Sequence, residues 1–363
     1  MMKPVATANS EISKILILVV KRVGEILLTT PAIRAFHKAF PDAQIDVVVD
    51  QPVQDVLEGI PYIHQLIRLD PERTPLKLVS AAIHLRKARY DITVDFLANP
   101  RTAFLSLIAN APVRIGLDKR IRKWAYNHYL CPSPEATSYV PDVRLNALRI
   151  LGLDTDGTVL DFRISKEGRE QGQQMLEDAR IGASDSYVAV APISLRAYKR
   201  WPPDHYAAVA DHLIRERQCK VVLVGGPGEY RFLESTHEFM RERAAALLEL
   251  RDLDSLAYIL SQSALYIGND SGIKHLASAV RVPTLTMFGP SNPAEWNEPD
   301  DPRHVVLWKE ISCREPKCWQ TCRYGYRCLE LVTVDDAIQA ADRLLAEAGT
   351  LKQQDTVRSV GTN

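Results

Sequence analysis

Short apolar runs alternate with amphipathic segments along the first half of the chain. Three of the apolar runs have the length of strands: residues 14–20, 44–49 and 90–96. Continuous apolar runs are typical of strands buried on both faces of a parallel sheet. Three other segments carry apolar residues at helical spacing: residues 26–40, 76–88 and 101–109. This alternation predicts βαβ units in a doubly wound α/β sheet.

The first helical segment contains a proline, Pro31. Proline inside a helix removes one backbone hydrogen bond and clashes with the preceding turn. Pro31 therefore either kinks one helix at residues 26–40 or begins the main body of that helix after a cap at Thr30.

The second half of the chain repeats the alternation. Four apolar runs have strand length: residues 187–191, 220–224, 264–267 and 283–288. Three segments have helical patterns: residues 202–217, 230–246 and 253–262. A polar, turn-rich stretch at residues 154–184, which contains a charged helix at residues 166–179, separates the two series. With 363 residues the chain is long enough for two cores, so the sequence predicts two Rossmann-like domains that face a central cleft.

These patterns also set the expected boundaries. We expect an N-terminal domain at residues 1–165 and a C-terminal domain at residues 166–332. Residues 333–348 predict a terminal helix with Thr333 at its N-cap. Residues 349–363 are polar and are expected to form a disordered tail.

A polar turn between two of the apolar runs is the strongest candidate for a ligand site. The stretch at residues 268–290 reads strand, turn, helix and strand, and its turn contains Asp270, Ser271 and Gly272. The N-terminus of a helix favours a phosphate because its backbone N–H groups and its dipole attract negative charge. In open α/β sheets such ligands bind at the carboxyl ends of the strands. The alternative is that Asp270 or Ser271 only caps the helix.

The glycine pattern argues against a dinucleotide-binding dehydrogenase. Such enzymes carry G-x-G-x-x-G directly after a strand. The first strand is followed by KRVGEI, which has one glycine, and the GGPGE turn at residues 225–229 has a different spacing.

Composition narrows the class of partner. Lysine plus arginine and aspartate plus glutamate both number 45, so the formal net charge is zero and nucleic acid is not an expected partner. The apolar run at residues 15–20 is too short for a signal-peptide core or a membrane span. We expect a cytoplasmic protein that can touch the surface of the membrane.

One local segment is strongly basic. Residues 113–130 combine aromatic side chains with a set of cations that includes four candidate contacts: Arg114, Lys119, Arg120 and Arg122. Such a patch suits an acidic glycan or a lipid head group. The alternative is a solvated face with a few packed aromatic side chains.

Four of the six cysteines cluster near the C-terminus. They are Cys313, Cys318, Cys322 and Cys328. Four thiolates in one short segment could hold a structural zinc ion or an iron–sulfur cluster. The spacing differs from the paired C-x2-C that is typical of zinc sites, and a reducing compartment disfavours disulfides. The alternative is a loop without metal.

Four motifs in order resemble glycosyltransferase family 9, which contains the ADP-heptose:lipopolysaccharide heptosyltransferases. The opening KILILVVKRVGEILLTTPAIRAFHKAFPDAQIDVVV resembles the first strand, turn and helix of that family. KRWPPDHYAAVADHL and GNDSGIKHLASAVRVPTLTMFGPSNPAEW resemble two later segments. The cysteine cluster followed by the helix at Thr333 is similar as well. The resemblance covers nearly the whole chain.

The resemblance implies a GT-B fold and an inverting transfer that needs no divalent metal. The acceptor would bind the N-terminal domain and the nucleotide sugar the C-terminal domain. The acidic residue of the first turn would be the general base, and here that residue is Glu25 in place of the usual aspartate. Either carboxylate can accept a proton from a hydroxyl within hydrogen-bond reach. The alternative role for Glu25 is a first-turn acid that interacts with the helix dipole.

The resemblance also implies a set of donor contacts. Lys199 and Ser194 would lie at the donor phosphates and Glu229 near the nucleoside, where it is otherwise a first-turn helix acid. The remaining candidates match the donor turn and the helix after it: Asp270, Ser271, Gly272 and His275. The family tends to have Pro-Met between Gly272 and His275, whereas this chain has Ile-Lys. Lys274 would then contact a phosphate or point into solvent.

The function implied is transfer of L-glycero-D-manno-heptose from ADP-heptose to the inner core of lipopolysaccharide, at the cytoplasmic face of the inner membrane. Three alternatives stay open: a family 9-like enzyme that transfers another sugar to a surface glycan, a GT-B-like sugar-nucleotide epimerase, and a catalytically silent nucleotide-sugar-binding protein. No cofactor is expected for catalysis.

Overall fold

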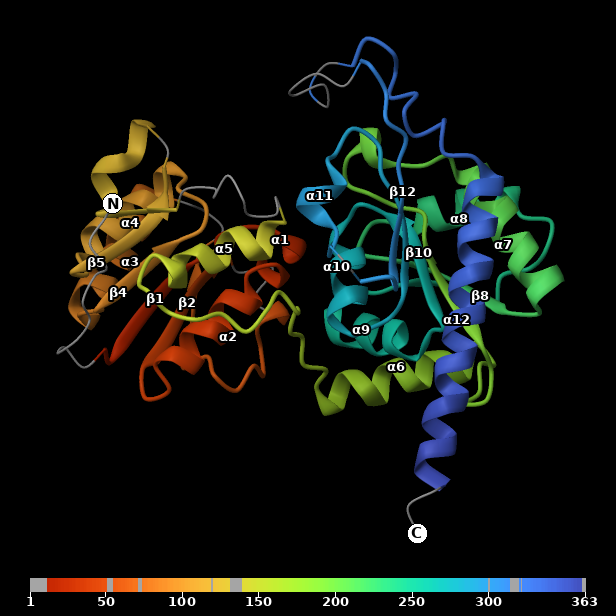
Figure 1. Ribbon diagram of the computed structural model, residues 1–363, viewed down its shortest axis with the longest axis horizontal. Coiled ribbons are helices and arrows are strands. Elements are labelled where there is room, and N and C mark those ends of the chain that lie inside the picture. Colours follow the sequence, from red (N-terminus) through yellow and green to blue (C-terminus); the bar gives the residue numbers. More distant parts are fainter. Residues whose placement is uncertain are drawn as a thin grey trace. The chain divides into compact units, whose positions relative to one another are not determined.

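Each half of the chain forms its own six-stranded parallel sheet with helices packed against it (Figure 1). The computed structural model describes residues 12–50, 55–70, 74–118, 120–130, 139–299, 301–313, 320 and 322–360. The chain divides into two units, Met1–Arg163 and Ile164–Asn363.

The sheet of the first unit has the strand order β3-β2-β1-β4-β5-β6. The strands are β1 (Lys14–Leu18), β2 (Gln44–Asp50), β3 (Gln65–Leu69), β4 (Ile92–Asp95), β5 (Val113–Leu117) and β6 (His128–Leu130). Ile15 of β1 pairs with Ile45 on one side and Ile92 on the other. The apolar residues of β1 are fully buried, which confirms the prediction of a central strand covered on both faces.

The helices of the first unit are α1 (Val23–Leu27), α2 (Thr30–Ala39), α3 (Pro75–Ala88), α4 (Pro100–Ala109) and α5 (Val140–Arg149), with a 3-10 helix, η2 (Arg120–Ala125). The segment expected as one helix at residues 26–40 is therefore two. Pro31 lies in the first turn of α2, and the residue at the N-cap is Thr29, not Thr30. A proline is tolerated in the first turn because the N–H it lacks has no partner in the helix.

The sheet of the second unit has the order β12-β11-β10-β7-β8-β9. Its strands are β7 (Tyr187–Ala191), β8 (Lys220–Gly225), β9 (Ala246–Glu249), β10 (Leu265–Asn269), β11 (Thr284–Met287) and β12 (His304–Leu307). Its helices are α6 (Lys166–Asp178), α7 (Pro203–Arg217), α8 (Tyr230–Phe239), α9 (Leu253–Gln262), α10 (Gly272–Ala279), α11 (Pro293–Trp296) and α12 (Val334–Val360), with the 3-10 helix η3 (Ala197–Lys199). α6 packs on α9, and α12 packs on α7 (Figure 1).

Several elements were missed or misplaced by the sequence patterns. The strands β3, β9 and β12 are short and partly exposed, so they lack the continuous apolar run that marks a central strand. β5 and β6 lie inside the segment that was assigned only as a basic patch. The helices α5 and α11 were not predicted either.

Two helix ends also differ from the prediction. α8 ends at Phe239 and not at residue 246, because the buried carboxylate of Asp211 accepts the N–H groups of Arg241 and Glu242 and holds the chain outside the helix. α12 continues to Val360, through the segment expected to be disordered. Residues 350–360 contain no proline or glycine, so nothing in that stretch stops helix propagation.

Among the described residues, none of the helices combines the length and the apolar character that a membrane crossing needs.

Candidate functional site

The candidate donor residues gather at the carboxyl edge of the second sheet. β7 lies between β10 and β8, so the chain order reverses there and the crevice beside β7 is where open α/β sheets bind ligands. Lys199 is in η3, after β7, and Asp270 directly follows β10. The Nζ atom of Lys199 donates to the Oδ2 atom of Asp270. The structure therefore brings together two residues that are 71 positions apart.

A buried asparagine fixes this edge. The Nδ2 atom of Asn269 donates to the carbonyl of Ile193 at 3.1 Å, and its Oδ1 atom accepts the N–H of Trp201 at 2.9 Å. The indole of Trp201 is itself buried and donates to the carbonyl of Val332 at 2.9 Å. Asn269 thus ties the end of β10 to the turn that carries Ser194, which lies buried after β7. The sequence patterns did not single out Asn269 for this role.

The helix after the turn begins without a side-chain cap. Ser271 is at the N-cap of α10, but its side chain makes no capping hydrogen bond. The prediction that Asp270 or Ser271 acts only as a cap is therefore wrong for the Ser271 side chain. Gly272 is the first residue of the helix, and His275 is buried within its first turns. α10 begins two residues after Asp270, so its N-terminus lies at the edge where Lys199 and Asp270 meet.

Lys274 is buried, so the expectation that it points into solvent is wrong. Its side chain is 1% exposed and its Nζ atom donates to the carbonyl of Trp296 at 2.8 Å. Burial lowers the pKa of Lys274 from 10.5 to about 8, and the nearby carboxylates of Asp270 and Glu298 oppose that shift only in part. Lys274 therefore connects α10 to α11.

The ring of Trp296 lies close to Lys199 and His275. The Nζ atom of Lys199 lies 5.8 Å from the centre of the indole, within reach of a cation–π interaction. The ring of His275 lies 6.3 Å from the same indole. Trp296 was not among the predicted site residues, because α11 has only four residues and is too short to show a periodic pattern.

The side chain of Glu229 forms a hydrogen bond with the glycine-rich loop that precedes it. Its Oε2 atom accepts the N–H of Gly226 at 2.7 Å. Burial raises the pKa of Glu229, although the Gly226 N–H and the charge of Arg200 favour the ionised form. Gly228 has a φ of 79°, a conformation that favours glycine. The carboxylate is therefore held at the end of β8 by the turn that follows this strand.

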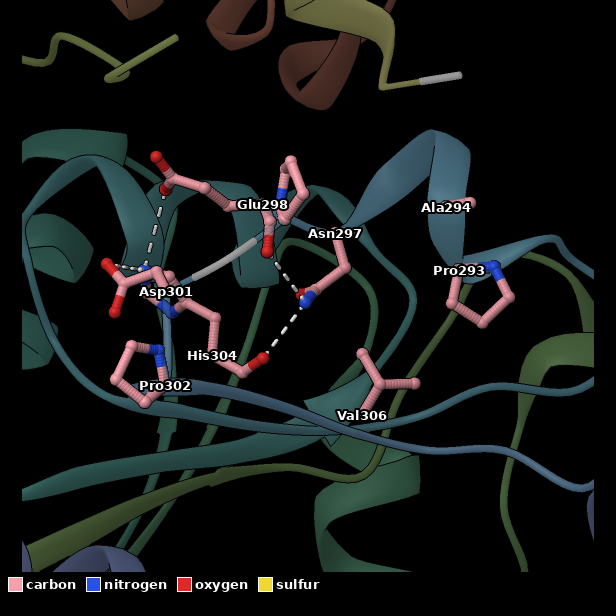
Figure 2. Close-up of a pocket in the computed structure, with 9 residues that line it drawn as sticks. Pro293, Ala294, Asn297, Glu298, Asp301, Pro302, His304 and Val306 are labelled. Atoms are coloured by element: carbon pink, nitrogen blue, oxygen red, sulfur yellow. Dashed lines mark hydrogen bonds and ion pairs between the residues drawn. The ribbon is translucent and has the colours of Figure 1, made fainter. Parts of the chain in front are cut away.

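An open hollow of about 510 Å³ lies beside α11 (Figure 2). Its wall includes a cluster of Glu298, Asp301 and His304, whose ligand atoms lie within 4.8 Å of one another. Arg303 donates to both oxygens of Asp301. Burial and the charge of Asp301 raise the pKa of Glu298, and the charges of Arg281, Lys274 and Arg303 oppose that rise only in part. Since Asp301 already has a cation as its partner, we interpret the cluster as an ion-pair network.

The candidate base in the first unit is held by a buried arginine. Glu25 is in α1, after β1, and its Oε2 atom accepts from the Nη2 atom of Arg144 at 2.5 Å. Its Oε1 atom accepts from Lys21 at 3.1 Å. Burial disfavours ionisation of Glu25, but the charges of Arg144 and Lys21 outweigh it, so the pKa of Glu25 lies below its usual value.

Arg144 also fixes the backbone around Glu25. Its Nη1 atom donates to the carbonyl of Glu25 and, at 2.6 Å, to the hydroxyl of Thr29. Arg144 lies in α5, which packs on α2. It was missed because the sequence patterns did not predict α5.

The basic patch is only partly described. Arg114 donates to the carbonyls of Ala125 and Ala111, and Arg122 donates to the carbonyl of Ala98. Both guanidinium groups thus contribute to the packing of their own unit. Lys119 and the side chain of Arg120 lie outside the described residues.

The C-terminal cysteines are also partly described, since Cys318 lies outside the described residues. Cys313, Cys322 and Cys328 form no disulfide. The Sγ atom of Cys322 accepts the N–H of Tyr326 at 3.3 Å. In the described part of the chain, these three sulfurs do not gather within 4.8 Å as a ligand group.

Comparison with known proteins decides the family. The sequence model of glycosyltransferase family 9 (heptosyltransferase) matches residues 79–326. The chain belongs to glycosyltransferase family 9. The lipopolysaccharide heptosyltransferase 3 of Escherichia coli is 26% identical over 337 residues, which cover 90% of this chain and 98% of that protein.

Solved structures of the same family share the fold. A family 9 glycosyltransferase from Veillonella parvula has a TM-score of 0.84 and 26% identity, and the match covers 93% of this chain and 99% of that one. The heptosyltransferase WaaC of E. coli, solved with ADP-2-deoxy-2-fluoro heptose, has a TM-score of 0.66 and 20% identity, and the match covers 91% and 99%. These likenesses confirm the predicted GT-B fold and place this family 9 chain among the glycosyltransferases.

Proposed function

We propose that this glycosyltransferase transfers L-glycero-D-manno-heptose from ADP-heptose to the inner core of lipopolysaccharide, with inversion and without a catalytic metal. The observation that carries the proposal is the contact between Lys199 and Asp270 beside the N-terminus of α10. This arrangement offers a cation and the N–H groups of a helix N-terminus to a diphosphate at the strand edge where α/β sheets bind such ligands. The E. coli relatives named above support heptose as the sugar.

In this proposal the second unit binds the donor. Lys199, Ser194, His275 and the Asp270-Ser271-Gly272 turn contact the phosphates, and Glu229 contacts the nucleoside. Lys199 and the N–H groups of α10 stabilise the negative charge that develops on the departing ADP, as a fixed array of donors does for any leaving oxyanion. That stabilisation takes the place of a divalent cation.

The first unit binds the acceptor and supplies the base. The carboxylate of Glu25 takes the proton of the acceptor hydroxyl while the oxygen of that hydroxyl attacks the anomeric carbon. The bond from this carbon to the phosphate oxygen breaks, and ADP leaves with the electron pair. Because the pKa of Glu25 is lowered by Arg144 and Lys21, the carboxylate is ionised and ready to accept a proton at neutral pH. Arg114, Lys119, Arg120 and Arg122 contribute contacts to the acidic acceptor.

The remaining predictions belong to the same proposal. The enzyme works at the cytoplasmic face of the inner membrane, where it contacts the membrane surface. Cys313, Cys318, Cys322 and Cys328 are candidates for a structural metal site that takes no part in the reaction. Elemental analysis of the purified protein, compared with a Cys322→Ser variant, tests the metal site: a stoichiometric zinc or iron content lost in the variant is the expected result.

The function is tested by incubating the purified protein with ADP-heptose and a heptose-less core acceptor, with and without EDTA. We expect transfer in both conditions and inversion at the anomeric carbon. Turnover of the donor without acceptor would instead indicate an epimerase, and binding without turnover would indicate a silent binding protein. A parallel screen of ADP-, UDP- and GDP-sugars tests the donor: preference for a uridine or guanosine donor overturns the assignment of ADP-heptose.

A further inference from the structure

We propose that the indole of Trp296 forms one wall of the subsite for the transferred sugar, and that Lys274 is the positioning residue that holds this wall in place. The inference rests on the proposed function, because it concerns the sugar end of the nucleotide-sugar donor.

The strand order predicts the directions in which the two ends of the donor extend. Along the carboxyl edge of the second sheet, β8, β7, β10 and β11 are consecutive neighbours. A diphosphate bound between β7 and β10 has one of its two substituents extending toward β8 and the other toward β11. The nucleoside is assigned to the side of β8, where Glu229 lies. The sugar therefore extends toward the segment that follows β11, and α11 with Trp296 is in that segment.

The surroundings of Trp296 suit a sugar ring. Its indole is near both Lys199 and His275, so it borders the place assigned to the phosphates. The side chain is partly exposed, whereas a tryptophan that served only the core would be buried, as Trp201 is. Small-molecule sites commonly combine an aromatic wall with a few polar groups that fix orientation. Trp296 supplies the wall, and Lys199 and His275 supply the polar groups.

The backbone that carries Trp296 is fixed from three directions. Lys274 donates to the carbonyl of Trp296 at 2.8 Å. Asn292 caps α11 by accepting the N–H of Ala294 at 3.1 Å. Asn297 donates through Nδ2 to the carbonyl of His304 at 2.9 Å, which ties the end of α11 to β12 (Figure 2).

The contact made by Lys274 links the backbone of this segment to α10. An ammonium group that is almost fully buried is costly unless it is hydrogen-bonded, so the lysine is suited to a directional contact and poorly suited to filling space. A methionine at this position would have no donor and could not make the bond. The helix that follows the phosphate turn therefore also holds the wall for the sugar.

The test compares the donor with its own leaving group. Binding of ADP-heptose and of free ADP is measured by calorimetry for the full-length wild-type protein and for Trp296→Leu, Trp296→Phe and Lys274→Met. If the wild type prefers another nucleotide sugar in the donor screen, that sugar and its nucleoside diphosphate are used instead. Phe239→Leu and Lys220→Met are the matched controls, since Phe239 is exposed at the end of α8 and Lys220 pairs with Asp185 at the start of β8.

We expect Trp296→Leu to weaken binding of the nucleotide sugar about tenfold, which is the value of one aromatic contact. Binding of the free nucleotide stays within about twofold of wild type, and Trp296→Phe restores most of the loss, because phenylalanine keeps an aromatic face. Lys274→Met also weakens binding of the nucleotide sugar selectively, but by a smaller factor, since it shifts the indole of Trp296 without removing it.

Three results would overturn the inference. Equal losses for the nucleotide sugar and the free nucleotide in Trp296→Leu would place the indole at the nucleotide. Unchanged binding of both ligands would remove Trp296 from the site. A wild-type protein that binds free nucleotides but no nucleotide sugar would overturn the inference and the proposed function together, whereas the first two results leave the proposed function standing.

Discussion

The two units present ion pairs of opposite polarity at corresponding places in their sheets. Each pair includes a residue close after the first strand of its sheet, β1 or β7. In the first unit the arginine is buried and the carboxylate is accessible, with exposed side-chain fractions of 6% for Arg144 and 21% for Glu25. In the second unit the carboxylate is buried and the cation is accessible, with 4% for Asp270 and 20% for Lys199.

This difference shows how one architecture can carry two kinds of chemistry. In the proposed function, the buried partner fixes the position and the charge of the accessible one, and the accessible one contacts the substrate. An accessible carboxylate suits proton abstraction, and an accessible ammonium suits a phosphate. The four predictions below test whether the accessible and buried partners act in these two ways.

The largest effect is expected from removal of the accessible carboxylate. Glu25→Gln keeps the shape of the side chain but cannot accept the proton, so we expect kcat to fall by about 10²- to 10⁴-fold. Binding of ADP-heptose, measured by calorimetry, stays unchanged because the proposed function assigns the donor to the other unit. Glu25→Asp, which keeps a carboxylate on a side chain one methylene shorter, keeps measurable transfer. A Glu25→Gln protein with wild-type kcat would remove Glu25 from the reaction.

The second prediction concerns the buried partner in the first unit. Arg144→Lys keeps a positive charge but loses the forked contact to the side chain and backbone of Glu25. We expect kcat/KM to fall about tenfold or more. The pKa of Glu25 rises in this variant, because burial is then opposed by a weaker contact.

The pH profile distinguishes this role from a merely structural one. In the wild type the pKa of Glu25 is lowered, so activity and the stability from this pair are lost only as the pH falls through that low value. In Arg144→Lys the acid limb of kcat/KM moves to higher pH. The control is Arg149→Lys, whose partner Asp142 lies on the same helix; an equal movement of the acid limb there would refute a specific role for Arg144.

The third prediction breaks the pair in the second unit. Lys199→Met removes the accessible cation, so both ADP and ADP-heptose should bind about tenfold more weakly, since a charged hydrogen bond to phosphate is lost. Asp270→Asn keeps the cation but loosens its position, and a smaller loss is expected. If Asp270→Asn weakened binding more than Lys199→Met, Asp270 itself would be the ligand contact and the comparison would fail.

The smallest effect is expected from the titration of Lys274. The pKa of this buried lysine is lowered from 10.5 to about 8, so between these values the unfolded chain binds the proton more strongly than the folded one. The free energy of unfolding therefore gains a positive slope with pH in that window. Urea unfolding of the wild type and of Lys274→Met, measured from pH 7 to about 10, should show a difference between the two proteins that changes with pH. A constant difference would mean that the lysine is not desolvated.

Much of the fold followed from local patterns. The central strands β1, β7, β8 and β10 are continuous apolar runs because both of their faces are covered, and this burial is visible in the sequence. The edge strands β3, β9 and β12 are partly exposed, so their composition resembles that of loops. The end of α8 was decided by a carboxylate on α7, which no local pattern reports.

The candidate site also has features that the sequence predicts and features that only the tertiary structure shows. The sequence by itself determined the parallel sheets and the turn at Asp270, because burial on two faces and turn chemistry are properties of neighbouring residues. Only the tertiary structure decided which groups meet: Arg144 with Glu25 across 119 positions, Lys199 with Asp270 across 71, and Lys274 with Trp296 across 22. Periodicity shows which side of an element is buried but not which partner lies there. A lysine near the start of a helix, such as Lys274, is expected to lie in solvent, and only the packing around it shows that it is buried.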